Sequence, residues 1–171
     1  LKRPDLYRPQ LTALLRASAF GDIRIMVPMI TCLDEVREVK AMIEEIKGEL
    51  DAKGIAYNKD IQVGIMAETP ASSIMADAFA KEVDFFSIGT NDLTGYTMCA
   101  DRGNQDVAYL YSTYNPAVLR AIERVIKLTN GSLSMSGMCG EAAADPLLTP
   151  LLLAVGMDEF PVSATSVLAK S

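Results

Sequence analysis

The sequence predicts an α/β fold built around a parallel β-sheet, and three observations support this prediction. Short apolar runs, typical of strands buried on both faces, alternate along the chain with amphipathic helical patterns. No low-complexity linker or composition break divides the 171 residues. Polar residues also follow the apolar runs directly, and the sites of α/β proteins lie at such strand ends. We therefore expect one domain, or a large piece of one, over residues 1–171, built from right-handed β-α-β units.

Five apolar runs are predicted to be strands. The last two are weaker candidates, because glycine and serine interrupt the fourth run and proline interrupts the fifth. In chain order the predicted strands are 23–30, 61–68, 83–90, 133–140 and 158–165.

Helices are expected between these strands. The best supported one carries an apolar stripe with spacings of three and four, which places the stripe on one face of about four helical turns. This stripe consists of Val36, Val39, Ile43, Ile46 and Leu50. The other predicted helices are 11–20, ending at Gly21, then 72–81, one from about Leu93, one after Pro116, and Pro146–Val155. Capping is expected from Thr31 with Asp34, from Thr69-Pro70, from Asn91-Asp92 and from Asn115-Pro116.

Two architectures fit this alternation, a doubly wound open sheet and a segment of an eight-fold (β/α) barrel. No glycine-rich dinucleotide loop follows any predicted strand. A complete barrel needs about 250 residues, so five strands would leave roughly three units missing.

Composition excludes several classes of function. The net charge is −6 and no run is rich in lysine or arginine, which argues against nucleic-acid binding and a polybasic membrane surface. No apolar stretch is long enough for a transmembrane helix, and the first residues lack a signal-peptide core. The chain has no histidine, which excludes a Ser-His triad, a histidine metal site or a phosphohistidine within it. Cys32, Cys99 and Cys139 lack metal-ligand spacing and are expected to be free thiols in a reducing cytoplasm.

The strongest chemical motif runs from Asp84 to Leu93 and delivers Asn91 and Asp92 from a strand onto the start of a helix. Such a helix start favours an anion, whereas a carboxylate there could hold a hard divalent cation. A purely structural role, in which both residues cap the helix, is an equal alternative on spacing alone. Glu68 and Cys139 also fall at strand ends.

The motif SIGTNDL, followed by YTMCADRGN, resembles the signature of the phosphoenolpyruvate-utilising enzymes. Three further blocks occur in that family's order, GIMAETPA (64–71), GMCGE (137–141) and DEFPVSA (158–164). The DRGN ending is more similar to the enzyme I group of the bacterial sugar phosphotransferase system than to pyruvate phosphate dikinase or phosphoenolpyruvate synthase. The resemblance implies a (β/α)8 TIM-type phosphoenolpyruvate/pyruvate barrel, with residues 1–171 as the C-terminal part of that domain, about five βα units.

The resemblance also implies roles for five residues. Glu68 and Asp92 match the family's two Mg²⁺ ligands, Asn91 matches a phosphate-binding residue, and Arg102 matches an arginine that binds phosphoenolpyruvate. Cys139 matches the acid that protonates the enolate to give pyruvate. Cys32 and Cys99 match no such role and are expected to be small buried apolar residues.

Three departures from the family pattern accompany the resemblance. Gly95 stands where the signature normally carries glutamine, and the segment 128–132, expected to be a surface turn, lacks the usual histidine. The family's other phosphate-binding arginines, its phosphohistidine domain and its carrier-docking domain would lie upstream of Leu1.

The implied activity is phosphoryl transfer from phosphoenolpyruvate to a histidine of an upstream domain and then to a histidine-containing carrier protein, with release of pyruvate. This is the first step of sugar uptake by the phosphotransferase system. The resemblance further implies Mg²⁺ dependence and a homodimer, while the composition predicts a cytoplasmic location and no nucleic-acid or membrane partner. Alone, the chain is expected to show little turnover because the acceptor histidine is absent. The alternatives are an inactive dimerisation or scaffold fragment and a relative of the dikinase or synthase.

Overall fold

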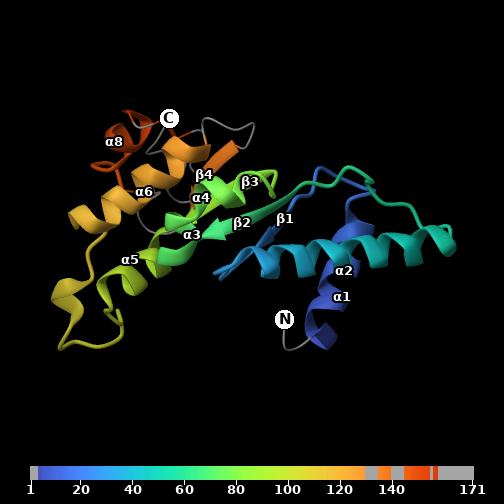
Figure 1. Cartoon of the computed structure of the whole chain (residues 1–171), viewed down its shortest axis with the longest axis horizontal. Coiled ribbons are helices and arrows are strands. Elements are labelled where there is room, and N and C mark those ends of the chain that lie inside the picture. Colours follow the sequence, from blue (N-terminus) through green and yellow to red (C-terminus); the bar gives the residue numbers. More distant parts are fainter. Residues whose placement is uncertain (1–3, 130–134, 140–144, 155, 158–171) are drawn as a thin grey trace.

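The computed structural model describes residues 4–129, 135–139, 145–154 and 156–157. Its centre is a four-stranded sheet in which every neighbouring pair is parallel and the order follows the chain, β1-β2-β3-β4 (Figure 1). These strands are β1 (Ile25–Val27), β2 (Val63–Ala67), β3 (Phe85–Gly89) and β4 (Met135–Cys139). The prediction of a parallel α/β fold is confirmed, although each strand is shorter than its apolar run. The fifth predicted strand, 158–165, lies outside the described residues.

The helices confirm the predicted alternation, with several differences at their ends. They are α1 (Pro4–Ala17), α2 (Leu33–Ala52), α3 (Pro70–Ile74), α4 (Ala76–Phe79), α5 (Thr90–Met98), the 3₁₀ turn η1 (Ala108–Leu110), α6 (Pro116–Thr129) and α8 (Thr149–Ala154). The helix expected over 72–81 is two short helices, and α1 begins well before the expected Leu11. No helix of the described ranges is long and apolar enough to cross a bilayer.

Two capping predictions are wrong. The N-cap of α2 is Cys32, and Glu35 rather than Asp34 reaches back, accepting from the backbone N–H of Thr31 at 2.7 Å and of Cys32 at 3.2 Å. Glutamate at the third helical position has the length that this reach requires, and aspartate does not. Helix α5 begins directly at Thr90, so Asn91 and Asp92 lie inside its first turn instead of capping it.

The N-terminus of α6 is as predicted. The side-chain oxygen of Asn115 accepts from the backbone N–H of Ala117 at 2.9 Å, and Pro116 is the first helical residue. The apolar side of α6 includes Val118, Ile122 and Val125, all of which are buried.

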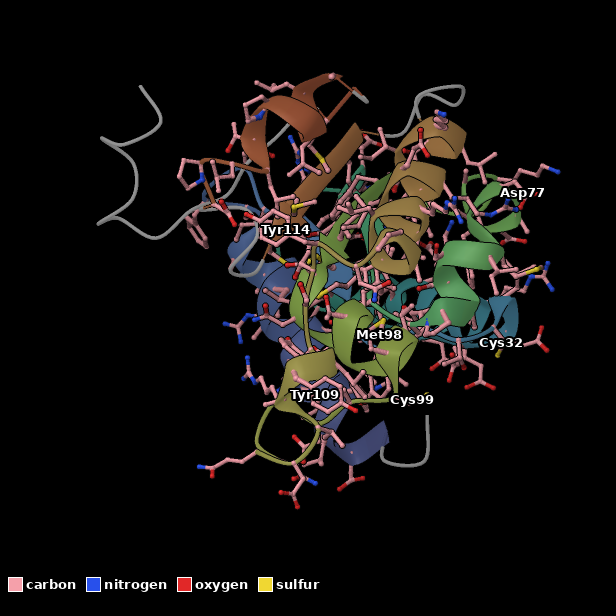
Figure 2. The ribbon with its side chains drawn as sticks, turned by 90° about the vertical axis from the view of Figure 1, so that its left-hand side faces the viewer. Cys32, Asp77, Met98, Cys99, Tyr109 and Tyr114 are labelled. Carbon is pink, nitrogen blue, oxygen red and sulfur yellow. The ribbon has the colours of Figure 1, made fainter. Side chains whose placement is uncertain are left out.

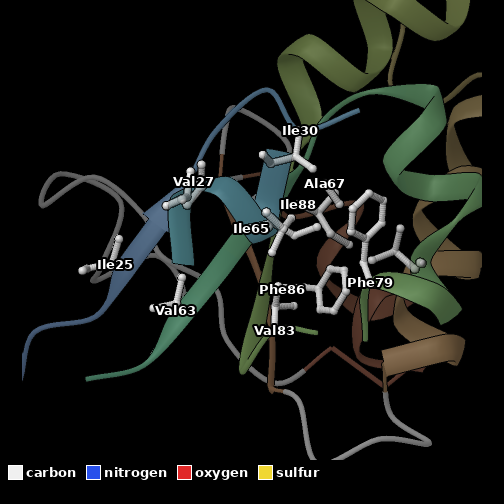
Figure 3. Packing of buried hydrophobic residues seen from close by; sticks show 14 of the residues in the cluster. Ile25, Val27, Ile30, Val63, Ile65, Ala67, Phe79, Val83, Phe86 and Ile88 are labelled. Carbon is white, nitrogen blue, oxygen red and sulfur yellow. The ribbon is translucent and has the colours of Figure 1, made fainter. Parts of the chain in front are cut away.

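The sheet has two faces of different character. One, the core face, is formed by Ile25, Val27, Val63, Ile65, Ala67, Phe86, Ile88 and Met138, all buried. Figure 3 shows Ile65 and Ile88 on neighbouring strands, with Phe79 from α4 beside Phe86. The other, the open face, consists of the alternate residues of the same strands, which are Met26, Gly64, Met66, Phe85, Ser87, Gly89, Gly137 and Cys139. Because side chains alternate along a strand, the open face is where these strands present residues outside the helix-covered core.

The strand order bears on the two competing architectures. A doubly wound sheet reverses its strand order at a switch point, whereas a barrel segment continues in one direction. The four described strands show no reversal, and right-handed connections in one direction keep the helices on one side of the sheet. A barrel segment has this order, and so does one half of a doubly wound sheet.

Candidate functional site

A carboxylate, a glycine and a thiol form a row across the C-terminal edge of the open face. Glu68 comes two residues after Met66, and Gly89 is paired with Cys139 across β3 and β4. Parallel strands are spaced about 4.8 Å apart, so the backbones at Glu68 and Cys139 lie about 10 Å apart. A Cβ atom at Gly89 would come within 2.7 Å of Glu68 Oε2 and 2.9 Å of Met66 Sδ. Glycine at position 89 therefore leaves room for the Glu68 carboxylate in this row.

Glu68 is a buried carboxylate, with 3% of its surface exposed. The backbone N–H of Met29 donates to its Oε1 at 2.7 Å, and the Asp92 carboxylate lies close enough to act on its charge. Burial raises the pKa of Glu68 and the neighbouring Asp92 carboxylate acts in the same direction, while the Met29 N–H opposes them. A buried carboxylate whose ionised form is disfavoured, with a second carboxylate beside it, is suited to a divalent cation, whose charge would stabilise the ionised form.

Asn91 and Asp92 lie on the first turn of α5, immediately after β3. With Arg102 they line a cavity of ≈ 440 Å³, whose wall also includes Gly95, Tyr96 and Tyr111. The Tyr111 hydroxyl donates to the backbone oxygen of Asn91 at 2.8 Å and ties the far wall to the start of the helix. A helix N-terminus, a guanidinium and an amide around one cavity are suited to an anion such as a phosphate or carboxylate.

Cys139 lies on the other side of the row, half-buried at the end of β4. Its Sγ is 3.6 Å from Ser87 Oγ, 3.6 Å from the backbone oxygen of Ile88 and 3.9 Å from Met66 Sδ. The Thr90 hydroxyl donates to the Cys139 backbone oxygen at 3.2 Å and fixes the strand end against α5. The structure thus brings three of the predicted residues, Asn91, Asp92 and Arg102, to one cavity, and Glu68 lies beside Asp92. Cys139 does not line this cavity. It lies on β4, two strands away from the β2 strand that precedes Glu68.

The expectation that Cys32 and Cys99 are buried is wrong. Both thiols are exposed and free, on the N-cap of α2 and the C-cap of α5 respectively (Figure 2). Both cysteines lie where a helix meets a loop, and the positive φ of Cys99, 50°, belongs to the left-handed cap that ends α5.

Gly95 forms part of the cavity wall. A Cβ atom there would lie 3.3 Å from the backbone oxygen of Ala100 and 3.7 Å from the Tyr111 ring, so any side chain at this position would enter the cavity. The predicted surface turn 128–132 is wrong at its start, because Leu128 and Thr129 end helix α6 and Thr129 is buried, and 130–132 lie outside the described residues.

The donor set is compatible with Mg²⁺. This ion prefers one or two carboxylates, with substrate or water oxygens completing an octahedron. Glu68 and Asp92 supply two carboxylates, and within the described ranges no cluster of three or more acidic, cysteine or histidine residues offers a closed protein cage. The residues therefore fit an open site, in which other ligands come from outside the protein.

Sequence reasoning missed three contributors to this site. Gly89 lies inside the signature, and Tyr111 lies a few residues after it. Gly89 could have been noticed as the last residue of a strand that leads into the helix of the site. Met29 acts through its backbone N–H, and its side chain gives no signal in the sequence.

Comparisons with known proteins agree with the motifs. Residues 1–171 match the family model described as "PEP-utilising enzyme, PEP-binding domain". The chain is 56% identical over 168 residues to the phosphoenolpyruvate-protein phosphotransferase of Geobacillus stearothermophilus and 55% identical to that of Latilactobacillus sakei. Each match covers 98% of this chain but 29% of the relative, so the chain spans less than a third of the length of these relatives.

A solved structure is similar in fold. The crystal structure of a citrate lyase from Burkholderia xenovorans LB400 superposes with a TM-score of 0.71, covering 95% of this chain and 52% of the lyase. Sequence identity between the two is 20%, so this likeness concerns the fold alone.

Proposed function

The chain belongs to the family of phosphoenolpyruvate-utilising enzymes, and we propose that it supplies the phosphoenolpyruvate site of a phosphoenolpyruvate-protein phosphotransferase. The observation that carries this proposal is the convergence of Glu68, Asp92, Asn91 and Arg102 at one end of a parallel sheet. The names of the relatives favour this reading over a dikinase or synthase. We take the sheet to be part of a (β/α)8 barrel, which the unreversed strand order supports.

Each residue has a distinct part in the proposed reaction. Glu68 and Asp92 would hold Mg²⁺, which would neutralise charge on the substrate's oxygens. Arg102 and Asn91 bind the anionic groups of phosphoenolpyruvate, and their fixed positions orient it for in-line transfer. The bond between phosphorus and the enol oxygen breaks, and the phosphoryl group passes to a histidine outside this histidine-free chain.

The enolate left behind needs a proton at carbon 3 to become pyruvate. We assign this proton to the Cys139 thiol, because Cys139 is half-buried on the open face, in the same row as Glu68. The resulting thiolate regains its proton from water. We further propose transfer of the phosphoryl group to a histidine-containing carrier protein, and action as a cytoplasmic homodimer.

Calorimetric titration of phosphoenolpyruvate, with and without Mg²⁺, tests the proposed site. We expect Mg²⁺-dependent binding that falls by at least about 100-fold in a Glu68→Gln/Asp92→Asn double variant, because both carboxylates that would hold the metal lose their charge. A Glu38→Gln variant, at an exposed position on α2, serves as the control for loss of negative charge. Unchanged, metal-independent binding in the double variant would refute the proposed roles of Glu68 and Asp92.

A further inference from the structure

The loop between β1 and α2 contains an unusual backbone conformation. Met29 has a φ of 56°, and of the described non-glycine residues only Met29 and Cys99 have positive φ. Residues other than glycine, asparagine and aspartate rarely adopt this left-handed conformation, because their Cβ crowds the backbone. Such conformations persist where surrounding structure imposes them, and they concentrate at functional sites.

The left-handed turn directs a hydrogen bond at the candidate metal ligand. The Met29 backbone N–H donates to Glu68 Oε1 at 2.7 Å, while the methionine side chain is 44% exposed. The adjacent residues are tied to the same strand end, because the Thr69 hydroxyl donates to the backbone oxygen of Ile30 at 2.8 Å. The contact with Glu68 thus depends on the backbone of Met29 and on its conformation.

The two oxygens of Glu68 have different surroundings. Oε1 accepts from Met29, whereas Oε2 lies against Gly89, next to the start of the helix that carries Asp92. A hydrogen bond from a backbone N–H restricts rotation of a carboxylate, which is otherwise broad about its last torsion angle. With Oε1 occupied by the Met29 N–H, Oε2 is the oxygen on the side of Gly89, where α5 begins.

We propose that Met29 is a positioning residue, whose left-handed backbone holds Glu68 so that it binds a divalent cation through Oε2 alone. This inference rests on the proposed metal role of Glu68. It assigns the orientation of Glu68 to Met29, and it predicts that Glu68 binds the ion through one of its two carboxylate oxygens.

Replacing one backbone amide by an ester tests the proposal directly. Cys32 allows native chemical ligation of a synthetic segment 1–31 to residues 32–171, and the segment can carry an ester between positions 28 and 29. The ester lacks the N–H but keeps every side chain. We expect Mn²⁺, used as the probe ion, to bind at least about fivefold more weakly than to the all-amide ligated chain, as measured by calorimetry.

Side-chain variants provide the matched controls. Met29→Gly favours the left-handed conformation and keeps the N–H, so its Mn²⁺ affinity should stay within about twofold of wild type. Met29→Val disfavours that conformation through its β-branched side chain, so its affinity should fall toward that of the ester. Circular dichroism of each chain verifies that the fold is retained.

The outcomes separate this inference from the function on which it rests. Mn²⁺ binding that is lost in Glu68→Gln but unchanged in the ester would overturn the role of Met29 alone. Equal losses in Met29→Gly and Met29→Val would also overturn it, since they would assign the effect to the side chain. Unchanged Mn²⁺ affinity in Glu68→Gln would overturn the proposed metal role together with this inference.

Discussion

The two faces of the sheet carry residues with different roles, although these residues are neighbours on the same strands. On the core face Ile65, Ile88 and Met138 are completely buried among helix side chains. One position away, Met66 and Cys139 face the open side and are only half-buried. Because strand side chains alternate with a period of two, one strand can supply stability on one face and chemistry on the other. The comparison predicts that substitutions on the two faces will have different measurable consequences.

The largest effect on folding is expected from the core face. Phe86→Ala removes a ring that is 1% exposed and should lower the free energy of unfolding by about 3–5 kcal/mol. Met66→Ala, on the adjacent strand but on the open face, should cost only about 1–2 kcal/mol, because part of its surface already contacts water. Urea unfolding monitored by circular dichroism measures both. Equal losses would contradict the division between the faces.

The next effect concerns activity on the open face. In the complete protein, Cys139→Ala should slow pyruvate formation by about 100-fold, the size typical of removing a general acid. Cys32→Ser is the matched control, because Cys32 is an exposed cysteine on the N-cap of α2, and serine is also a good N-cap. A coupled assay for pyruvate follows both variants. Wild-type rates in Cys139→Ala would remove this thiol from the mechanism.

A smaller effect is expected from alanine substitutions at two glycines, Gly89 on the open face and Gly48 on α2. Gly89→Ala places a methyl group within 3 Å of Glu68 and Met66, and such overpacking typically costs about 1–3 kcal/mol. It should also weaken Mg²⁺-dependent binding, because Glu68 must move. Gly48→Ala, on α2 with nothing within 4 Å of the new methyl group, should instead stabilise by about 0.4–1 kcal/mol. Thermal unfolding compares the two, and a stabilised Gly89→Ala would show that the row has spare room.

How much of the fold and of the candidate site could be predicted depends on which features leave a pattern in the sequence. The apolar runs and the stripe from Val36 to Leu50 identified the described strands and α2, because burial leaves a periodic pattern. Asn91, Asp92 and Arg102 were found through the signature, and the structure brings them to one cavity. The start of α5 was misplaced because asparagine and aspartate suit both a cap and a first turn.

What sequence could not supply is the contribution of the backbone. The hydrogen bond from Met29 to Glu68 joins residues 39 positions apart and uses no side-chain atom of Met29. The cap of α2 depends similarly on the length of Glu35, whereas Thr31 and Asp34 matched the capping pattern equally well. Such contacts depend on where loops meet strands, which periodicity does not encode.

The smallest predicted effect compares two carboxylates that both accept from the loop before α2. Partial burial acts to raise the pKa of Glu35, but hydrogen bonds from the N–H groups of Thr31 and Cys32 outweigh burial, so this pKa is lowered. For Glu68, burial together with the neighbouring Asp92 outweighs the single N–H of Met29, so this pKa is raised. Glu35 should therefore stabilise the fold above about pH 4.5, and this contribution is lost as the pH falls through its folded pKa. For Glu68 the sign is opposite, since its contribution is present below about pH 4.5 and is lost as the pH rises through its folded pKa.

Unfolding at pH 4 and pH 7 without divalent ions measures this difference. At pH 7 Glu35→Gln should lower stability by about 0.3–1 kcal/mol, the usual value of a negative charge at a helix start. The difference in stability between Glu68→Gln and wild type should be more favourable to the variant at pH 7 than at pH 4. The reason is that the variant lacks a buried charge that the native state resists forming at the higher pH. The same sign of pH dependence in both variants would contradict the opposite shifts, and would mean that Glu68 is as well solvated as Glu35.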